Sequence, residues 1–330
     1  MKDLLILCKD DINKIFDNEE EMIMNMVSQA YVEHTAGNSS LPHSIFLRFP
    51  DNPANRIIGL PAYLGGNIKA GGMKWISSFP DNINHGMERA SAVLILNNME
   101  NGHVEAILES SVISAKRTAA SAALAAKLIH QNNNETTIGF VGCGRINREI
   151  AGFIKKVYKD INTFVVYDSI HQHALNFIDA IKEENINIRI ASSIDEVLQL
   201  APLVSFATTA GTPYISDISS CDSKSTILNI SLRDFSPEVV LQCDNIVDDL
   251  DHVCRERTSI HLTEQLRGNR DFVRCPIADI ITNPDLARTG DKPVMFSPFG
   301  LGVLDLILGS YAKKIALEKN MGVTIKDFIK

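Results

Sequence analysis

Four cationic side chains in the N-terminal part of the chain stand where residues of their type can bind an anion or move a proton. They are Arg48, Lys74, Arg89 and Arg117. Lys74 lies among apolar residues and Arg117 lies in an alanine-rich segment, positions where lysine and arginine seldom occur without a partner. Arginine binds a carboxylate through a planar fork of donors, whereas lysine acts as a point charge or as a base with a tunable pKa.

Each of these cations, taken singly, is better explained as a surface charge or as one half of a structural ion pair. A nucleotide-binding domain in the same chain changes that interpretation, because a group of cations facing an anionic substrate then becomes the better explanation. The four cations are therefore candidate substrate-binding residues.

A glycine-containing turn predicts such a domain. An apolar run, 138–141, ends in Gly142-Cys-Gly144, a helical pattern follows, and a second apolar run, 163–167, ends at Asp168. Gly142 allows a tight turn, and Gly144 lets the backbone approach a pyrophosphate at the positive end of the helix. Asp168 is placed to accept a hydrogen bond from the ribose 2′-hydroxyl and would repel a 2′-phosphate, which favours NAD over NADP.

The turn departs from the usual pattern at Asn147, which stands where a third glycine or an alanine is common. A glycine turn in another kind of α/β domain is therefore the alternative. Arg145 and Ile146, at the start of the predicted helix, are further candidate cofactor contacts. Thr208 follows a later strand, where ligands of such sheets bind, and can contact the nicotinamide ribose or belong to a plain loop.

Composition limits the remaining possibilities. The 330 residues suit two domains, and 45% hydrophobic with 22% charged residues is typical of a globular protein. A net charge of −8 disfavours general nucleic-acid binding, and no apolar run is long enough to span a bilayer. The N-terminal stretch lacks the features of a signal peptide, so we expect a cytoplasmic protein. The six cysteines and nine histidines show no metal-ligand spacing, so we expect no metal.

The elements that position the four cations differ from those around the glycine turn. Residues 11–36 have the spacing of one or two helices. Short apolar runs then predict strands of a mostly antiparallel α+β domain, and Asn101-Gly102 predicts a hairpin between the last two. The predicted strands are 44–49, 56–64, 68–77, 90–96 and 104–109.

An alanine-rich helix over 112–129 leads into a Rossmann-type doubly wound sheet, so the fold class is α/β. After Asp168 we expect a helix over 173–184 and another that begins with the capping box of Ser193 and Glu196. Further strands are expected at 186–191, 203–209, 226–231 and 245–248. An amphipathic helix over 303–319 should return to pack on the first domain. Residues 118–302 then form the NAD-binding domain, and 1–117 with 303–330 form a substrate-binding and dimerisation domain.

Several stretches resemble the ornithine cyclodeaminase/μ-crystallin family. They are 72–76, 109–121, 141–144, and 298–302 with Asp305, in the family's order. Within the family, 87–97, 229–231 and 247–249 are similar to the dehydrogenases of 2,3-diaminopropionate biosynthesis. The resemblance implies a homodimer, and it implies that Lys74 and Arg117 match the family's substrate-binding lysine and arginine. Thr118, next to that arginine, joins the candidate cofactor contacts.

Two departures from the family bear on the reaction. Ser44 falls near the place of an upstream family arginine, for which Arg48 can substitute. Ornithine cyclodeaminases carry an aspartate shortly after the strand that corresponds to 227–230, whereas here Asp234 is displaced in the stretch 231–235. That argues against cyclodeamination.

The subgroup resemblance implies NAD-dependent oxidative hydrolysis of N-(2-amino-2-carboxyethyl)-L-glutamate to 2,3-diaminopropionate and 2-oxoglutarate. An upstream synthase would supply this substrate within a siderophore or antibiotic pathway. Its three carboxylates need several cations, and Lys74 can also serve as general base, which an arginine cannot do at neutral pH. Candidates for the group that activates water are Glu88, Asp234, His252 and Asp305.

Three readings of the function therefore remain. The first is the dehydrogenase just described. The second is a cyclodeaminase or an imine reductase of the same family, and the third is a protein that binds NAD(P)H without turnover.

Overall fold

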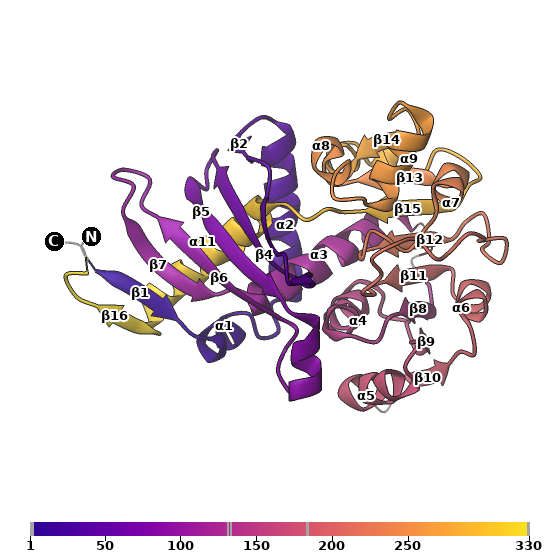
Figure 1. The fold of residues 1–330 in the computed structure, drawn as a ribbon, viewed down its shortest axis with the longest axis horizontal. Coiled ribbons are helices and arrows are strands. Elements are labelled where there is room, and N and C mark those ends of the chain that lie inside the picture. Colours follow the sequence, from indigo (N-terminus) through magenta and orange to yellow (C-terminus); the bar gives the residue numbers. More distant parts are fainter. Residues whose placement is uncertain (1–2, 131, 133, 183–184, 329–330) are drawn as a thin grey trace. The chain divides into compact units, whose positions relative to one another are not determined.

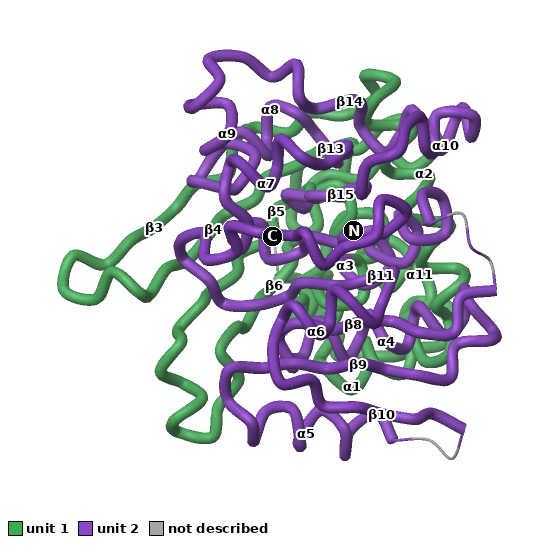
Figure 2. The backbone as a smooth tube through the Cα atoms, turned by 90° about the vertical axis from the view of Figure 1, so that its right-hand side faces the viewer, with its two compact units in different colours: residues 1–117, 301–330 green, residues 118–300 purple. Residues whose placement is uncertain are grey.

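A computed structural model describes residues 3–130, 132, 134–182 and 185–328 of the chain. It divides into two compact units, shown in Figure 2: unit 1 comprises residues 1–117 and 301–330, and unit 2 comprises residues 118–300. The long helix α3 (Ser111–Ile129) crosses the first boundary. No helix among these described residues is both long enough and apolar enough to span a bilayer.

Unit 1 is built on an eight-stranded sheet with the order β16-β1-β7-β6-β5-β4-β2, and β3 also pairs with β4 (Figure 1). Every pair is antiparallel except β1 with β7, so the prediction of a mostly antiparallel α+β domain is confirmed. The strands are β1 (Leu4–Leu7), β2 (Ser39–Ser40), β3 (Ile45–Phe49), β4 (Asn52–Leu64), β5 (Ala70–Ser78), β6 (Ala90–Asn97), β7 (Val104–Glu109) and β16 (Val323–Ile325).

Helix α11 (Gly302–Lys319) lies on one face of this sheet, against β4, β5 and β6, and α2 (Glu20–Thr35) packs on it (Figure 1). The short helices α1 (Lys9–Ile15) and η1 (Pro80–His85) complete the unit. The prediction of an amphipathic helix was wrong for the first half of α11. Residues 302–309 are all buried, because the sheet covers one side of the helix and α2 covers another.

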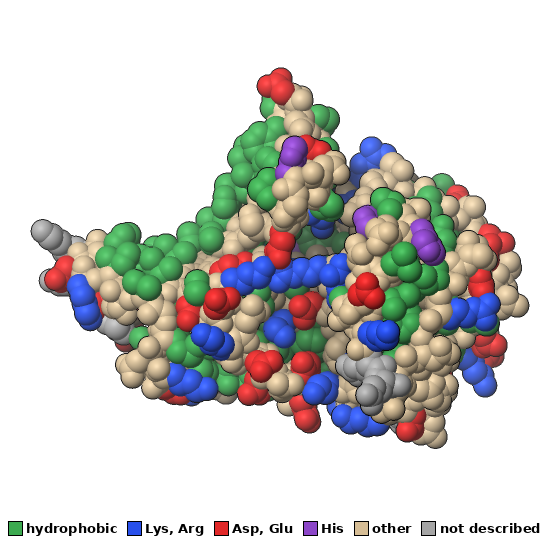
Figure 3. Space-filling model, turned by 90° about the horizontal axis from the view of Figure 1, so that it is seen from below, with side chains coloured by type: hydrophobic (Ala, Val, Ile, Leu, Met, Phe, Trp, Pro, Cys, Tyr) green, Lys and Arg blue, Asp and Glu red, His purple; other side chains and the backbone are tan. Residues whose placement is uncertain are grey.

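The opposite face of the sheet is apolar and open. One row across it, Ile45, Gly59, Trp75 and Val93, pairs strand by strand from β3 to β6. Ile45 is 62% exposed, and Trp75 and Val93 are also exposed. Hydrophobic side chains gather on the surface of unit 1 in Figure 3. Since isolated apolar residues are common on protein surfaces but contiguous ones are not, this face has the character of an interface.

Unit 2 contains a parallel sheet of eight strands in the order β10-β9-β8-β11-β12-β15-β13-β14 (Figure 1). The first five follow the strand order of a Rossmann fold, so the predicted doubly wound sheet is confirmed. The strands are β8 (Thr137–Val141), β9 (Thr163–Tyr167), β10 (Asn187–Ile190), β11 (Leu203–Phe206), β12 (Thr226–Asn229), β13 (Asp244–Val247), β14 (Val273–Pro276) and β15 (Val294–Ser297).

Helices alternate with these strands. Ser193 caps α6 by accepting a hydrogen bond from the Glu196 N–H, as the capping box predicts. Helix α5 begins before the predicted residue 173 and ends at 181, while residues 183 and 184 lie outside the described part. The remaining bounds are α4 (Arg145–Val157), α5 (His171–Ile181), α6 (Ile194–Leu200), α7 (Pro237–Gln242), α8 (Leu250–Val253), α9 (Ser259–Arg267), α10 (Ile277–Thr282) and η2 (Pro284–Leu286).

Candidate functional site

Lys74 extends from β5 toward α11, away from the open face. Its partners across the sheet are Leu60 on β4 and Leu94 on β6, so the lysine stands in an apolar row and is only 2% exposed. The neighbouring Gly72 has to be a glycine, since a Cβ there would lie 2.0 Å from the carbonyl oxygen of Ile95 on β6. The close approach of β5 and β6 therefore fixes the backbone from which Lys74 extends.

Three side chains from two helices surround the Lys74 ammonium. Its Nζ donates to Asp305 Oδ2 at 2.6 Å and to Ser114 Oγ at 3.2 Å. Arg117, one turn after Ser114 on α3, places its Nε 3.6 Å from Asp305 Oδ1 and its Nη2 3.5 Å from Ser114 Oγ. We call Lys74, Ser114, Arg117 and Asp305 the Lys74 cluster. All four residues belong to unit 1.

The Lys74 cluster carries more positive than negative charge. Asp305 is fully buried in the first turn of α11, where the helix dipole favours an acid, and it faces two cations alone. Burial is the largest cause that lowers the pKa of Lys74 to about 8, and Arg117 lowers it further, while Asp305 opposes both. Lys74 is thus protonated at neutral pH but can release its proton at modest cost.

Two polar atoms of the Lys74 cluster face each other as an ion pair at 3.6 Å, beyond hydrogen-bond distance. Within the described residues, Arg117 Nε and Asp305 Oδ1 are buried and have no hydrogen-bond partner. Buried polar groups normally have such a partner. The excess positive charge and the guanidinium with an unsatisfied Nε are features expected of a site that binds a carboxylate.

The structure brings two of the four candidate cations into the Lys74 cluster and places the other two elsewhere. Arg48 is exposed on β3, with its guanidinium 5.3 Å from the centre of the Phe46 ring. Arg89 precedes β6 and donates to Ser78 Oγ at 3.0 Å. Glu88, a candidate for water activation, is half exposed and pairs with Lys9 at 2.7 Å.

The sequence analysis did not identify Ser114 as a site residue. A serine inside a helix is common and carries no signal of its own. Its position three residues before Arg117 puts both side chains on one face of α3, and that spacing is the signal that points to it.

Two other candidates for water activation lie in unit 2. Asp234 is fully buried and accepts hydrogen bonds from the hydroxyls of Thr208, Tyr214 and Ser231. The Thr208 hydroxyl in turn accepts from the Ala210 N–H, so this side chain ties the loops after β11 and β12 together. The contact of Thr208 with a cofactor stays a prediction.

His252 and Asp249 form a pair on α8. The His252 Nδ1 lies 2.8 Å from Asp249 Oδ1, and that hydrogen bond is the main reason why the pKa of His252 is raised. His173, in the first turn of α5, lies with Nδ1 3.4 Å from Asp168 Oδ1. Within the described residues, no group of three or more histidines, cysteines or acids is arranged to hold a metal ion.

The glycine turn after β8 leaves space at the start of α4, as expected of a turn that binds a pyrophosphate. Gly142 has φ +87°, and a Cβ there would lie 2.5 Å from the Ala207 carbonyl oxygen. Gly144 is the N-cap of α4, and a Cβ there would meet no heavy atom within 4 Å, so the space in front of the helix is open. The first N–H groups of α4, at Arg145 and Ile146, border that space.

Asn147 stands where a third glycine is common, and its side chain forms hydrogen bonds with the neighbouring backbone. Its Nδ2 donates to the carbonyl oxygens of Val141 at 3.0 Å and Gly142 at 2.6 Å, and its Oδ1 accepts from Ser205 Oγ. The side chain is fully buried. It therefore holds the turn to β8 and β11, and the departure from the usual glycine pattern does not open the packing.

Asp168 stands at the end of β9, next to the turn. Its Oδ2 accepts from the Cys143 N–H at 2.8 Å and its Oδ1 from the Ile170 N–H at 2.9 Å. A carboxylate oxygen has two acceptor positions. Oδ1 also faces His173 Nδ1 at 3.4 Å, so Oδ2 is the oxygen that keeps a position for a further donor such as a ribose hydroxyl.

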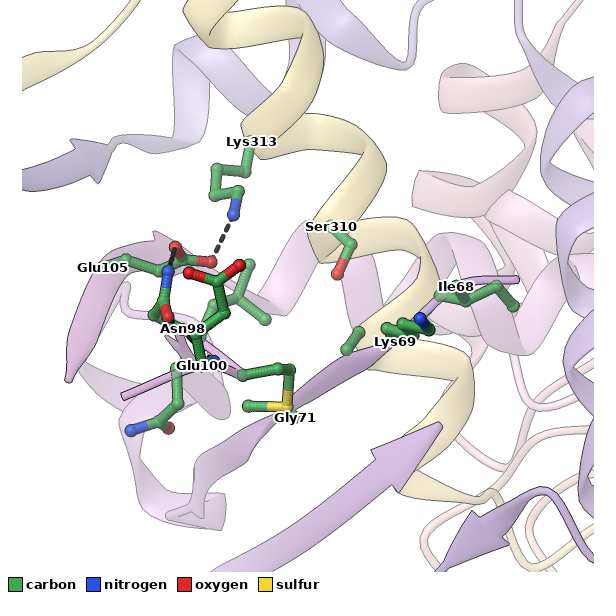
Figure 4. A pocket seen from close by; sticks show the side chains of 12 residues that line it. Ile68, Lys69, Gly71, Asn98, Glu100, Glu105, Ser310 and Lys313 are labelled. Atoms are coloured by element: carbon green, nitrogen blue, oxygen red, sulfur yellow. Dashed lines mark hydrogen bonds and ion pairs between the residues drawn. The ribbon is translucent and has the colours of Figure 1, made fainter. Parts of the chain in front are cut away.

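A cavity of 380 Å³ lies elsewhere in unit 1, between α11 and the ends of β5, β6 and β7 (Figure 4). Lys313 and Glu105 form an ion pair on its wall, and Ser310 and Lys69 also line it. No residue of the Lys74 cluster lines this cavity.

The family of the chain follows from a comparison with known proteins. The model of the ornithine cyclodeaminase/mu-crystallin family matches residues 6–219. The chain belongs to this family.

Named relatives narrow the class of reaction. N-((2S)-2-amino-2-carboxyethyl)-L-glutamate dehydrogenase of Staphylococcus aureus is 28% identical, with 98% of each chain covered. Among solved structures, Δ(1)-pyrroline-2-carboxylate reductase of Thermococcus litoralis, in complex with NADH and L-proline, is similar with a TM-score of 0.89 at 22% identity, covering 97% of this chain and 100% of that one. An archaeal alanine dehydrogenase dimer with bound NAD has a TM-score of 0.85 at 23% identity, covering 98% and 99%. The two structures establish the shared fold.

The Asp305→Asn variant should lose about 3–5 kcal/mol of unfolding free energy at pH 7, because it leaves the buried Lys74 ammonium and Arg117 guanidinium without an anion. The double variant Lys74→Met/Asp305→Leu should regain part of the loss, since it removes the buried ammonium while the Arg117 guanidinium stays without an anion. Urea unfolding measures both.

Lys9→Gln is the control, because the exposed pair of Lys9 with Glu88 contributes about 0–1 kcal/mol. If Asp305→Asn lowered the stability no more than Lys9→Gln does, the ion pair would not have the energetic role assigned to it.

Proposed function

We propose that the chain is an NAD-dependent dehydrogenase that converts N-(2-amino-2-carboxyethyl)-L-glutamate and water to L-2,3-diaminopropionate and 2-oxoglutarate. The observation that carries the proposal is the Lys74 cluster, which offers a carboxylate site and a base of lowered pKa in one place. The S. aureus relative, which covers nearly the whole chain, has this substrate in its name. An upstream synthase would supply the substrate.

The glycine turn of unit 2 fits NAD. We assign the pyrophosphate to Gly142, Gly144 and the first N–H groups of α4, at Arg145 and Ile146, and the ribose hydroxyls to Asp168. The two solved neighbours are complexes with NADH and NAD, which supports this assignment. Thr118 and Thr208 complete the proposed set.

Substrate binding is assigned to the cations of unit 1, Arg48, Lys74, Arg89 and Arg117, which face three carboxylates. In the Lys74 cluster, Arg117 binds one carboxylate through its guanidinium, and Asp305 holds the Lys74 ammonium in place. The third hydrogen of that ammonium has no acceptor among the described residues, so it is available to the substrate.

The reaction breaks the Cα–H and Cα–N bonds of the glutamyl group. The nicotinamide supplies hydride acceptance when NAD is bound. As the hydride leaves the glutamyl Cα, neutral Lys74 removes the proton of the secondary amine, which leaves a C=N bond in the substrate. Water adds to that carbon, and cleavage of the C–N bond gives the ketone of 2-oxoglutarate and the amine of 2,3-diaminopropionate.

An imine reductase is the second candidate. The similarity to Δ(1)-pyrroline-2-carboxylate reductase along almost the whole chain favours it. Such a substrate carries a single carboxylate, which Arg117 and Lys74 can bind without help. The arginines outside the Lys74 cluster would then have no role in binding, which is why we rank this function below the first.

The open face of the unit 1 sheet is the proposed dimer interface. Ile45, Trp75 and Val93 expose apolar surface in one row, and the archaeal alanine dehydrogenase is a dimer. Light scattering should give twice the mass of the chain, and Trp75→Glu should shift it toward one chain, because it places a charge in the middle of the interface. A wild-type mass of one chain would contradict the interface.

The direct test of the function is NADH absorbance on mixing the protein, NAD and N-(2-amino-2-carboxyethyl)-L-glutamate. We expect one NADH and one 2-oxoglutarate for each substrate consumed. NADP should support a slower reaction, because Asp168 repels the 2′-phosphate.

L-Ornithine and Δ(1)-pyrroline-2-carboxylate are the parallel substrates. Proline and ammonia from ornithine without net NADH would make the protein a cyclodeaminase. NADH consumption with the pyrroline alone would make it a reductase.

The pH dependence tests Lys74 as the base. Lys74 is protonated below its pKa of about 8 and neutral above it, so kcat/KM should rise with pH and level off above about 8. Lys74→Arg keeps the charge but cannot release a proton, so we expect kcat to fall by about 10²–10⁴ and the rise to disappear. If the Lys74→Arg variant kept the wild-type kcat and the rise of kcat/KM with pH, Lys74 would only hold a carboxylate.

A further inference from the structure

Arg89 stands in surroundings that call for an anion. Its guanidinium is half-buried and donates to a neutral partner, Ser78 Oγ, at 3.0 Å. Burial lowers the pKa of Arg89, and the positive charge of Arg56 lowers it further. Within the described part of the chain, no carboxylate pairs with Arg89. A half-buried guanidinium whose hydrogen-bond partner is a neutral hydroxyl is unfavourable unless a negative charge joins it.

The register of the sheet places these arginines on the same face as Lys74. Side chains of a strand alternate between faces, so Ser78, four residues after Lys74 on β5, extends to the side of α11 as Lys74 does. Ser78 pairs with Arg56 on β4, and Arg56 pairs with Arg48 on β3. These residues form what we call the arginine row, and Arg89 reaches it through Ser78.

The row of side chains between Lys74 and the arginine row is apolar. Ile76 lies midway along β5 and pairs with Ile58 on β4, which pairs with Phe46 on β3. These three side chains are half-buried, so they keep some exposed surface. One face of the sheet therefore presents, in sequence, the Lys74 cluster, an apolar row and the arginine row.

The arginines of unit 1 are concentrated at this place. The unit contains four, Arg48, Arg56, Arg89 and Arg117, whereas its other cations are lysines. Three of the four belong to the arginine row or contact it, and the fourth is in the Lys74 cluster. Arginine is the better residue for binding a carboxylate through two parallel hydrogen bonds.

We propose that Arg89 and Arg56, together with Ser78, form a second carboxylate subsite that selects a long substrate with an anionic group at each end. The inference rests on the proposed function and names the structural feature that separates its tricarboxylate substrate from amino acids with one carboxylate. The apolar row contacts the methylene groups between the two anionic ends.

The dimensions agree with this assignment. Four residues along a strand span about 13 Å, which separates the Lys74 row from the arginine row. The carboxyl carbons at the two ends of N-(2-amino-2-carboxyethyl)-L-glutamate are seven bonds apart, or about 8 Å in an extended chain. With a charge-assisted hydrogen bond of about 2.8 Å at each end, the substrate spans a comparable distance.

Suberate and octanoate test the subsite without any turnover. Suberate has carboxylates at the same seven-bond separation, and octanoate has the same aliphatic chain with one carboxylate. Ligand-observed NMR on the full chain should give a dissociation constant for suberate about tenfold to a hundredfold below that for octanoate. Arg89→Met should abolish this ratio while leaving the octanoate affinity unchanged.

Two further variants control the result. Arg56→Met should also reduce the ratio, which keeps the inference testable if Arg89→Met fails to fold. Lys326→Met removes an exposed cation of unit 1 that pairs with Asp3, and it should leave the ratio unchanged. A wild-type ratio near one, or a ratio unaffected by both arginine variants, would overturn the subsite.

The test separates this inference from the proposed function. If the ratio depends on Arg89 while the NADH assay with the tricarboxylate is silent, the subsite stands and the reaction is wrong. If NADH forms and Arg89→Met leaves both the ratio and KM unchanged, the reaction stands and the subsite is wrong.

Discussion

The ion pair between Lys74 and Asp305 is the interaction on which unit 1 depends. Its partners are 231 residues apart in the chain and almost completely buried, so neither charge can be satisfied by water. Removing one partner from such a pair costs far more unfolding free energy than replacing both partners with apolar residues. The pair therefore fixes the first turn of α11 against β5, and with it the way in which the C-terminal segment completes a unit that residues 1–117 begin.

The same pair sets the chemistry of the site. Burial alone favours a neutral lysine, and the positive charge of Arg117 acts in the same direction, while Asp305 keeps the ammonium form accessible. The balance leaves the pKa near 8, where a lysine can both carry a charge and give it up close to neutral pH. A second carboxylate would raise the pKa of Lys74, and the Lys74 cluster contains only one, Asp305.

The sequence predicted those features whose signals are local. Strand periodicity in 44–109 and the glycine turn before Asp168 each lie within a short stretch, and both correspond to observed elements. The contact of Lys74 with Asp305 has no local signal, because it depends on how α11 returns to the sheet. The strands β1 and β16 are too short to show a period, and the burial of α11 on several sides follows from α2, which no pattern within 303–319 reveals.

Strand β5 explains why one short stretch carries so much of the family resemblance. Consecutive residues of a strand point to opposite faces, so Lys74 and Ser78 belong to the proposed substrate face while Trp75 belongs to the open face. Gly72 fixes the distance to β6 for both. A one-residue slip would exchange the two faces, burying Trp75 under α11 and placing Lys74 on the open face. The proposed substrate face and the proposed dimer interface therefore depend on a single backbone register, and the stretch 72–76 contributes to both.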